Sequence, residues 1–226
     1  MNERLLYLGL DPSSFKTQKI IVHYPIIKIA PKSFENQFIQ DALNHFHSFT
    51  HILITSKSSI KILKDYLNKK NISIDDWNTK QTYAVGKVTA KHLQENGIHV
   101  SCIAQKETAE GLIEEVSNRL KNDDVKKVHF FWPHSSLGRA VIPDFFNSQH
   151  IHLTACDLYD TIDQVPEKVP NLNDFHEIVF TSPSTVDAFI KIFKIFPTEK
   201  KLTAIGPITE EYLRYHTCSN VHISSL

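Results

Sequence analysis

The sequence predicts an α/β fold built from parallel β-sheets. Short apolar segments alternate along the chain with segments in which apolar residues recur every three or four positions. The first pattern is typical of buried strands and the second of amphipathic helices. Neighbouring parallel strands need crossover connections long enough to hold a helix, and this alternation supplies them. The 226 residues, of which 41% are hydrophobic, are enough for one large or two small packed domains.

A pair of motifs occurs twice, once in each half of the chain. In each copy a hydroxyl pair directly follows one apolar run, and Gly-x-x-Thr directly follows the next. In chain order these motifs are Thr55-Ser56, Gly86-x-x-Thr89, Thr181-Ser182 and Gly206-x-x-Thr209. Each opens a helix pattern, and the N-terminus of a helix has free backbone N–H groups that bind anions. We expect four anion-binding strand ends, with ordinary Ser and Thr helix caps as the alternative. Neither glycine motif matches a nucleotide-binding loop.

The predicted strands and helices follow one another in chain order. The strands are Leu5–Leu10, Lys19–Ile29, Ile52–Ile54, Thr82–Val85, His99–Ile103, Val128–Trp132, Ile151–Leu158, Ile178–Phe180, Leu202–Ile205 and Val221–Ile223. The helix patterns are Ser58–Lys69, Thr89–Asn96, Ala109–Leu120, Leu137–Ser148, Ser184–Phe196 and Thr209–His216. Only residues 11–18 separate the first strand from the second, which is too few for a full helix. The first unit of the fold is therefore degenerate or shortened.

Two proline clusters mark crossings between domains. Pro25 and Pro31 form the first cluster, and Pro166 and Pro170 form the second. Residues 171–173 also interrupt any regular pattern after the second cluster. These two crossings predict that the middle of the chain forms one domain and that the two ends together form the other.

Charge, hydropathy and cysteine usage exclude several classes of protein. The 25 basic and 25 acidic residues balance, which gives no electrostatic case for binding nucleic acid or an acidic membrane. The N-terminus lacks the apolar run of a signal peptide, and no segment has the length of a membrane span. Cys102, Cys156 and Cys218 are widely spaced and form no Cys-x-x-Cys motif. We therefore expect a soluble, reduced, cytoplasmic protein.

A third strand end, in residues 131–136, opens a helix pattern with Arg139 in its first turn. A cation there opposes the helix dipole, so we expect the side chain to meet an anion; a solvated arginine is the alternative. His45, His47 and His51 are close in sequence, but no Cys or carboxylate completes a metal-ligand set at suitable spacing. No nucleophile–base–orienter set can be assembled, so an enzyme of this sequence would work by positioning its ligand.

In this order the motifs resemble the uroporphyrinogen-III synthase family over about residues 50–215. The matching segments are Ile54-Thr55-Ser56, Ala84-Val85-Gly86-x-x-Thr89-Ala90, Ala109-Glu110-Gly111-Leu112, residues 131–143, Tyr159-Asp160-Thr161, Phe180-Thr181-Ser182-Pro183-Ser184 and Ala204-Ile205-Gly206-Pro207-x-Thr209. No single motif is specific, whereas the ordered set with an interrupted domain is hard to match elsewhere.

The resemblance implies two flavodoxin-like parallel-sheet domains joined by a two-stranded β-ladder, with the active site in the cleft between the domains. The end domain would comprise residues 1–26 and 163–226, and the middle domain residues 33–156. The ladder would comprise residues 27–32 and 157–162, which agrees with the proline crossings.

The resemblance also implies a reaction. The family converts linear hydroxymethylbilane to uroporphyrinogen III, with inversion of ring D, cyclisation and loss of water, and without a metal or cofactor. The substrate carries eight carboxylates, which suits helix N-termini and hydroxyl donors in a chain without net charge. The expected partner is this small tetrapyrrole, with neither nucleic acid nor membrane, and we expect a monomer.

The resemblance assigns the catalytic role to Tyr159, which would help the ring-A hydroxyl to leave. From the residues alone, Tyr159 is either a packed strand aromatic with a satisfied hydroxyl or a hinge tyrosine facing the cleft. The expected substrate contacts are Thr55, Ser56, Gly86, Thr89, His134, Ser135, Arg139, Thr181, Ser182, Ser184, Gly206, Ile208 and Thr209.

Two departures from the family pattern fall on the end domain. Its first helix is missing, and the chain ends at Leu226 before one further helix that is usual in the family. They motivate one alternative, a catalytically weakened tetrapyrrole- or carboxylate-binding module of the same fold. Another alternative is a two-domain protein that binds a small anion and closes by hinge motion.

Overall fold

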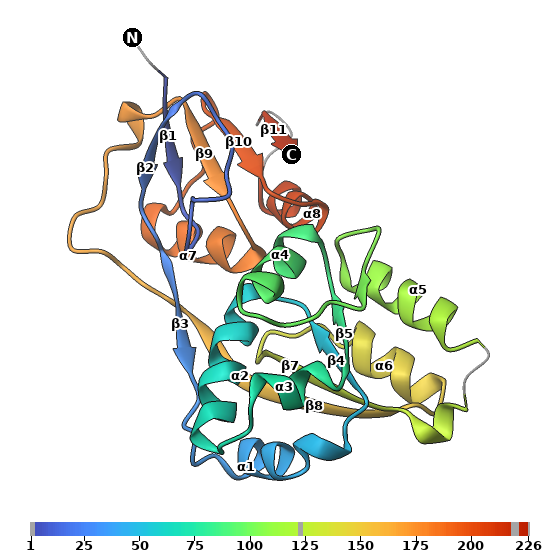
Figure 1. Ribbon diagram of the computed structural model, residues 1–226. Helices are drawn as coiled ribbons and strands as arrows, with labels where there is room; N and C mark the ends of the chain where they lie inside the picture. The colour runs from blue at the N-terminus through green and yellow to red at the C-terminus, as the bar shows by residue number, and fades with distance from the viewer. Residues whose placement is uncertain (1–2, 122–123, 218–221, 226) are drawn as a thin grey trace. The chain divides into compact units, whose positions relative to one another are not determined.

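The computed structural model describes residues 3–121, 124–217 and 222–225, and its chain forms two compact units (Figure 1). The end unit consists of Met1–Ile29 and Thr161–Leu226, and the middle unit consists of Ala30–Asp160. The two boundaries between the units fall inside the segments 27–32 and 157–162. No helix in the described part of the chain has the length and apolar character needed to cross a membrane.

The sheet of the end unit has five strands, and every described pair is parallel. In spatial order they are β11 (Ile223–Ser225), β10 (Lys201–Ala204), β9 (Glu177–Phe180), β1 (Arg4–Tyr7) and β2 (Ile20–His23). Numbered along this unit, that order is 2-1-3-4-5 from the β2 edge, an order found in doubly wound sheets. Helices α7 (Pro183–Phe193) and α8 (Pro207–His216) each follow a strand. Both helices begin with proline. The backbone N–H at this position has no acceptor within the helix, so a residue without an N–H is tolerated there.

A loop replaces the missing first helix of the end unit. Residues 11–18 contain no helix, as their number predicts. Phe15 of this loop lies edge-on to Tyr7, with ring centroids 5.5 Å apart. Together with Ile21 it packs on a buried patch that includes Leu5 and Val179. An aromatic side chain thus covers a sheet face that a helix would otherwise cover.

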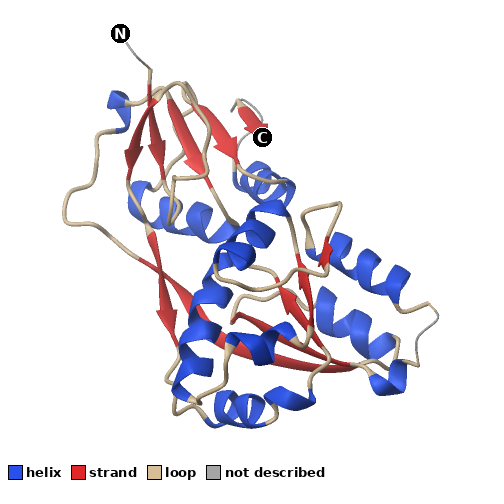
Figure 2. Cartoon of the chain, viewed as in Figure 1, coloured by secondary structure: helices blue, strands red, loops and turns tan. Residues whose placement is uncertain are grey.

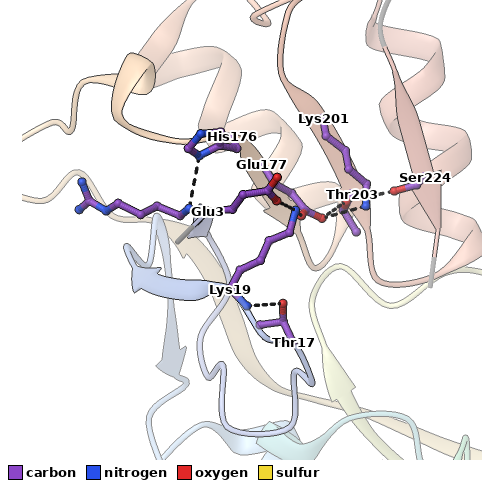
Figure 3. Close-up of polar contacts among 9 residues, drawn as sticks. Glu3, Thr17, Lys19, His176, Glu177, Lys201, Thr203 and Ser224 are labelled. Carbon is purple, nitrogen blue, oxygen red and sulfur yellow. Dashed lines mark hydrogen bonds and ion pairs between the residues drawn. The ribbon is translucent and has the colours of Figure 1, made fainter. Parts of the chain in front are cut away.

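Polar side chains join the amino ends of the strands in the end unit (Figure 3). The buried Glu177, at the start of β9, accepts a hydrogen bond from Lys19 Nζ at 2.8 Å, and its other oxygen lies 3.3 Å from Lys201 Nζ. Thr203 donates a further hydrogen bond to Glu177, and Lys19 also pairs with Glu3 at 2.6 Å. Burial raises the pKa of Glu177, but the hydrogen bonds from Lys19 and Thr203 and the lysine charges hold it below its usual value. This carboxylate is therefore ionised and fully paired at neutral pH.

The sheet of the middle unit has six strands. Five of them, all except the edge strand β3, pair in parallel. In spatial order the strands are β3 (Ile27–Pro31), β8 (His152–Asp163), β7 (His129–Ser135), β4 (His51–Ile54), β5 (Gln81–Ala84) and β6 (Cys102–Ile103). The helical elements are α1 (Gln37–Asn44), η1 (Phe46–Ser48), α2 (Lys57–Lys69), α3 (Ile74–Asn78), α4 (Lys87–Glu95), α5 (Ala109–Arg119), η2 (Val125–Lys127) and α6 (Val141–Ser148). The remaining 3₁₀ turn, η3 (Leu172–Asp174), belongs to the end unit.

Helices cover both faces of this sheet (Figure 2). Phe130 and Trp132 of β7 face the layer that contains α5 and α6, where they join the buried Leu112 and Phe146. Because side chains alternate along a strand, the intervening Phe131 points to the opposite face, where it lies against Phe46 and Phe49. Strands buried on both faces explain why these runs are apolar throughout rather than alternating.

Strands β3 and β8 connect the two units and are hydrogen-bonded neighbours. Lys32 N donates to the carbonyl of Leu158 at 2.9 Å, and Gln164 N donates to the carbonyl of Ile26 at 2.8 Å. The partner number falls as the chain number rises, so the two strands run antiparallel.

Several elements differ from the sequence prediction. Helix α6 begins at Val141 rather than Leu137, because Gly138 N closes a turn on the carbonyl of Ser135 at 2.7 Å. Arg139 therefore precedes the helix and does not lie in its first turn, which corrects the dipole argument. Strand β6 has two residues instead of the predicted His99–Ile103. Helices α1 and α3 were not predicted, although Asn36 and Ser73 cap them. Part of the predicted strand Val221–Ile223 lies outside the described residues.

Replacing Tyr24 by Phe is expected to raise the free energy of unfolding by about 1 kcal/mol. The Tyr24 hydroxyl is buried and has no hydrogen-bond partner among the described residues. Tyr7, also buried in the same unit, is the matched control because its hydroxyl donates to the carbonyl of Asp11 at 3.0 Å. Tyr7→Phe is expected to lower the free energy of unfolding by about 1 kcal/mol. Urea denaturation measures both, and a destabilised Tyr24→Phe variant would contradict the assignment.

Candidate functional site

Each sheet has a switch point where neighbouring strands lead to connections that run in opposite directions. It lies between β1 and β9 in the end unit and between β7 and β4 in the middle unit. Ligands of open α/β sheets bind beyond the carboxyl ends of the strands at such points. Thr55-Ser56 directly follows β4, Ser135 ends β7, and Thr181-Ser182 directly follows β9. The predicted hydroxyl pairs therefore lie at both switch points.

Ser56 brings three elements of the middle unit together. Its Oγ caps α2 by accepting a hydrogen bond from Ser59 N at 3.2 Å. The same oxygen lies 2.7 Å from the Tyr159 hydroxyl, and either atom can be the donor. Tyr159 is buried in β8. The structure thus places the predicted catalytic residue against a predicted substrate contact, with its hydroxyl satisfied.

Thr55 continues the polar contacts at this strand end. Its Oγ1 accepts a hydrogen bond from Trp132 Nε1 at 3.2 Å. The indole of Trp132 stacks on the His134 imidazole, with ring centroids 3.9 Å apart and an interplanar angle of 18°. Trp132 thus fixes the side chain of Thr55 from the neighbouring strand, a role that no motif in the sequence predicts.

His134 is buried and surrounded by protein acceptors. Its Nδ1 lies 2.7 Å from the carbonyl oxygen of Ser135, and its Nε2 lies 3.2 Å from Asp157 Oδ1. Burial lowers the pKa of His134, while the hydrogen bond to Ser135 and the charge of Asp157 oppose that shift. Asp157 also pairs with Lys32 Nζ at 3.3 Å. This geometry favours a supporting role for His134 over an open contact with substrate.

Arg139 meets an anion, but one that the chain itself supplies. Its guanidinium forms two hydrogen bonds of 2.8 Å with the carboxylate of Glu110. Arg139 and Glu110 are each about half exposed. The hydrogen bonds from Arg139 lower the pKa of Glu110 to about 2. A substrate carboxylate that bound Arg139 would therefore compete with Glu110.

The N-terminus of α4, which follows strand β5, binds a carboxylate of the chain itself. Gly86 is the N-cap of α4, and Lys87 N donates a hydrogen bond to Glu107 Oε1 at 3.0 Å. A Cβ atom at Gly86 would lie 2.6 Å from Glu107 Cδ, so the lack of a side chain lets the carboxylate approach closely. Thr89, in the first turn, is buried. Gly86 thus serves a carboxylate, whereas the Thr89 side chain is turned away from solvent.

In the end unit the predicted residues differ in their surroundings. Ser182 is the N-cap of α7, and its hydroxyl is buried with no partner among the described residues. The Thr181 side chain leaves no room for a Cβ atom at Gly9, which lies at the end of β1. Gly206 is the N-cap of α8, and a Cβ atom there would meet nothing within 4 Å. Thr209 is buried, like Thr89. Ser184 and Ile208 are half-buried, in the first turns of the same two helices.

The close histidines form no metal site. His45 Nδ1 lies 2.8 Å from the carbonyl of Asp41, and His51 Nδ1 lies 2.7 Å from Thr50 Oγ1. His47 Nδ1 lies 3.9 Å from a different group, Asp76 Oδ1. Within residues 3–121, 124–217 and 222–225 no group of three or more His, Cys, Asp or Glu side chains could hold a metal ion.

Replacing Arg139 by Gln is expected to return the pKa of Glu110 from about 2 toward its ordinary value of 4.5. The two hydrogen bonds from the guanidinium are the main cause of the lowered pKa, and this substitution removes them. Carboxyl-detected NMR titration measures this shift. The folded pKa is depressed, so the pair stabilises the protein above pH 4.5 and loses that effect as the pH falls toward 2. Both side chains are about half exposed, so the ion pair contributes on the order of a few tenths of a kcal/mol to the free energy of unfolding. Asp76, whose pKa is lowered by hydrogen bonds from Ser73, is the control, and its pKa should be the same in this variant.

Comparison with known proteins places this geometry in a family. A model of the uroporphyrinogen-III synthase HemD family matches residues 16–225. The porphyrin biosynthesis protein HemD of Ruminiclostridium josui is 29% identical over 212 residues, which cover 90% of this chain. The chain spans only 38% of the length of that relative.

Two solved structures are similar in fold. A mutant uroporphyrinogen III synthase from Thermus thermophilus has a TM-score of 0.65 at 14% identity, over 99% of this chain and 91% of that one. The uroporphyrinogen-III synthetase of Helicobacter pylori 26695 has a TM-score of 0.63 at 16% identity, over 99% and 92%. Both likenesses show a shared α/β fold. The family match covers most of the sequence and confirms the predicted resemblance: this chain belongs to the uroporphyrinogen-III synthase HemD family.

Proposed function

We propose that the protein is a uroporphyrinogen-III synthase, which converts hydroxymethylbilane to uroporphyrinogen III with inversion of ring D, cyclisation and loss of water. The family match over residues 16–225 is the observation that carries this proposal. The polar strand ends support it, because a substrate with eight carboxylates needs many N–H and hydroxyl donors.

Helix N-termini supply these donors in each unit. Gly86 already accommodates the Glu107 carboxylate, so a substrate carboxylate would find the same N–H group there. Gly206 leaves open space at the N-terminus of α8. The Ser182 hydroxyl is buried without a partner among the described residues, and a ligand acceptor that reached it would recover the lost hydrogen bond. Ser135, Arg139, Thr181, Ser184 and Ile208 belong to the same proposed set, as do Thr55, Ser56, Thr89 and Thr209. His134 is left out of this set because both of its ring nitrogens already face protein acceptors.

Tyr159 is the proposed general acid. In the first step the C–O bond of the ring-A hydroxymethyl group breaks, and the departing hydroxide takes a proton to leave as water. One lone pair of Ser56 Oγ is used by Ser59 N, and the Ser56 O–H can point to the Tyr159 oxygen 2.7 Å away. The phenolic hydrogen of Tyr159 is then free for the leaving group, and Ser56 stabilises the phenolate that forms.

Loss of the ring-A pyrrole N–H proton, which returns a proton to the Tyr159 phenolate, leaves the neutral azafulvene. Its exocyclic carbon is attacked by the substituted carbon of ring D. The spiro intermediate then fragments and recloses to the type III ring. Because the azafulvene closes unaided to the type I isomer, the protein's task is to fold the chain of four rings. No step of this scheme requires a metal or cofactor, and chelators are expected to leave the activity unchanged.

The finer structural predictions belong to the same proposal. They are two flavodoxin-like domains with boundaries at 1–26 plus 163–226 and at 33–156, joined by a ladder of 27–32 and 157–162, with the active site in the cleft between them. A monomeric state and a cytoplasmic location are likewise proposed. The alternative, a weakened tetrapyrrole- or carboxylate-binding module, is motivated by the loop that replaces the first helix of the end unit.

The activity is tested by adding the purified protein to freshly made hydroxymethylbilane, oxidising the products and separating the uroporphyrin isomers. A dominant type III product is expected. Type I product alone, at the rate of the blank, would reject synthase activity and leave the binding module as the function to examine.

Tyr159→Phe is expected to lower kcat by about a hundredfold or more, since general acid catalysis contributes about that much. Binding of uroporphyrinogen III, measured by fluorescence quenching, should be retained because the ring of Tyr159 stays in place. Tyr215→Phe, at a tyrosine that is 85% exposed, is the control and should behave as the wild type. Full activity in Tyr159→Phe would remove this residue from the mechanism.

A further inference from the structure

Strands β7 and β8 change register next to Tyr159. The pairing runs regularly from His129 opposite His152 to His134 opposite Asp157. The next residue of β7, Ser135, is opposite Tyr159, so Leu158 is an extra residue in β8. Such a β-bulge re-aims the side chains that follow it. Here the re-aimed residue is the one whose hydroxyl meets Ser56.

The last regular pair before this bulge contains His134. A carbonyl oxygen can only accept, so the contact of 2.7 Å with the Ser135 carbonyl requires a hydrogen on His134 Nδ1. Asp157 Oδ1 faces the other ring nitrogen, Nε2, at 3.2 Å, so both nitrogens point at oxygen acceptors. Burial lowers the pKa of His134, whereas these two acceptors oppose that shift. Asp157 also pairs with Lys32 Nζ.

The imidazole is held by a stacked ring and by the turn that follows. Trp132 stacks on it at 3.9 Å. A Cβ atom at Gly138 would lie 2.6 Å from His134 Nδ1 and 3.0 Å from the Trp132 ring. The turn that Gly138 N closes on the Ser135 carbonyl therefore fits directly against the imidazole. The same carbonyl oxygen accepts from both His134 and Gly138.

A backbone hydrogen bond at the bulge joins this turn to Tyr159. Ser136 N, in the turn, donates a hydrogen bond of 2.9 Å to the carbonyl of Tyr159. The Tyr159 backbone is thus attached to the turn that His134 holds, and its hydroxyl lies 2.7 Å from Ser56.

We propose that His134 is a positioning residue of the reaction: its Nδ1–H hydrogen bond to the Ser135 carbonyl fixes the bulge that sets the Tyr159 hydroxyl against Ser56. This inference rests on the proposed catalytic role of Tyr159. It assigns His134 a function through Tyr159 and not through contact with substrate.

Two amide substitutions at His134 distinguish the contribution of Nδ1 from that of Nε2. The side-chain amide of Asn reaches the position of Nδ1, and that of Gln reaches the position of Nε2. His134→Asn is expected to keep kcat within about threefold of the wild type, whereas His134→Gln should lower it about tenfold or more, with KM changed less than about twofold in both. The same pair of substitutions at the exposed His152 is the matched control and should have no effect.

A double-mutant comparison shows whether His134 acts through Tyr159. In the Tyr159→Phe background, His134→Gln should lower the residual kcat by less than about twofold, because the group that it positions is already gone. An equal loss in both backgrounds, or equal losses for Asn and Gln, would overturn the proposal.

A readout without activity separates this proposal from the proposed function. In protein labelled with ¹³C at the tyrosine ring, the Tyr159 Cζ resonance should move in His134→Gln and stay in place in His134→Asn. If the wild type made no type III product, the proposed function would fail while this measurement still decided the positioning of Tyr159. An unmoved resonance in a folded His134→Gln variant, checked by its melting temperature, would reject the positioning role.

Discussion

The hydroxyl–hydroxyl contact of Ser56 and Tyr159 joins two residues 103 positions apart and is the point on which the middle unit's site depends. The Ser56 oxygen also caps α2, so the start of that helix, the end of β4 and the bulged part of β8 all meet at one atom. A shift of any of these elements would alter the direction of the phenolic O–H. That dependence explains why strand pairing in β7 and β8, and not the local sequence around Tyr159, sets the position of its hydroxyl.

Anion binding at the strand ends is balanced by the protein's own carboxylates. Glu107 meets the N-terminus of α4, and Glu110 meets Arg139. In both cases a group that could bind an external carboxylate is already occupied by a carboxylate of the chain. The Arg139–Glu110 ion pair is about half exposed and therefore contributes little to stability. This arrangement satisfies the guanidinium and the Lys87 N–H within the chain itself.

The fold class and most elements could be predicted because apolar periodicity records burial. Strands such as β4 and β9 are buried on both faces and read as apolar runs. The start of α6 could not be predicted, since it depends on a turn that closes over His134. The candidate site residues stand out in the sequence as motifs, but the partners that the structure gives them could not be predicted. Trp132 and Asp157 act across neighbouring strands, and the bulge that follows them leaves no periodic signal. Glu107 and Glu110 lie directly before and within α5, where their spacing alone does not show that they turn toward other elements.

The discontinuous end unit has a consequence for the order of events during synthesis. Its strands β1 and β2 leave the ribosome first, but β1 pairs with β9, and the lysine beside β2 reaches a carboxylate 158 residues further along the chain. The middle unit is continuous in sequence and can close while these two strands wait. Until β9 emerges, the native cover of Leu5, Leu6 and Tyr7 is incomplete. Val179 of β9 belongs to the cluster of Leu5 and Tyr7, and Ile178 and Phe180 of β9 belong to the cluster of Leu6. The nascent chain is therefore most open to misassociation at the segment that holds β1 and β2, and a chaperone that binds this segment would act during the whole period in which the middle unit folds.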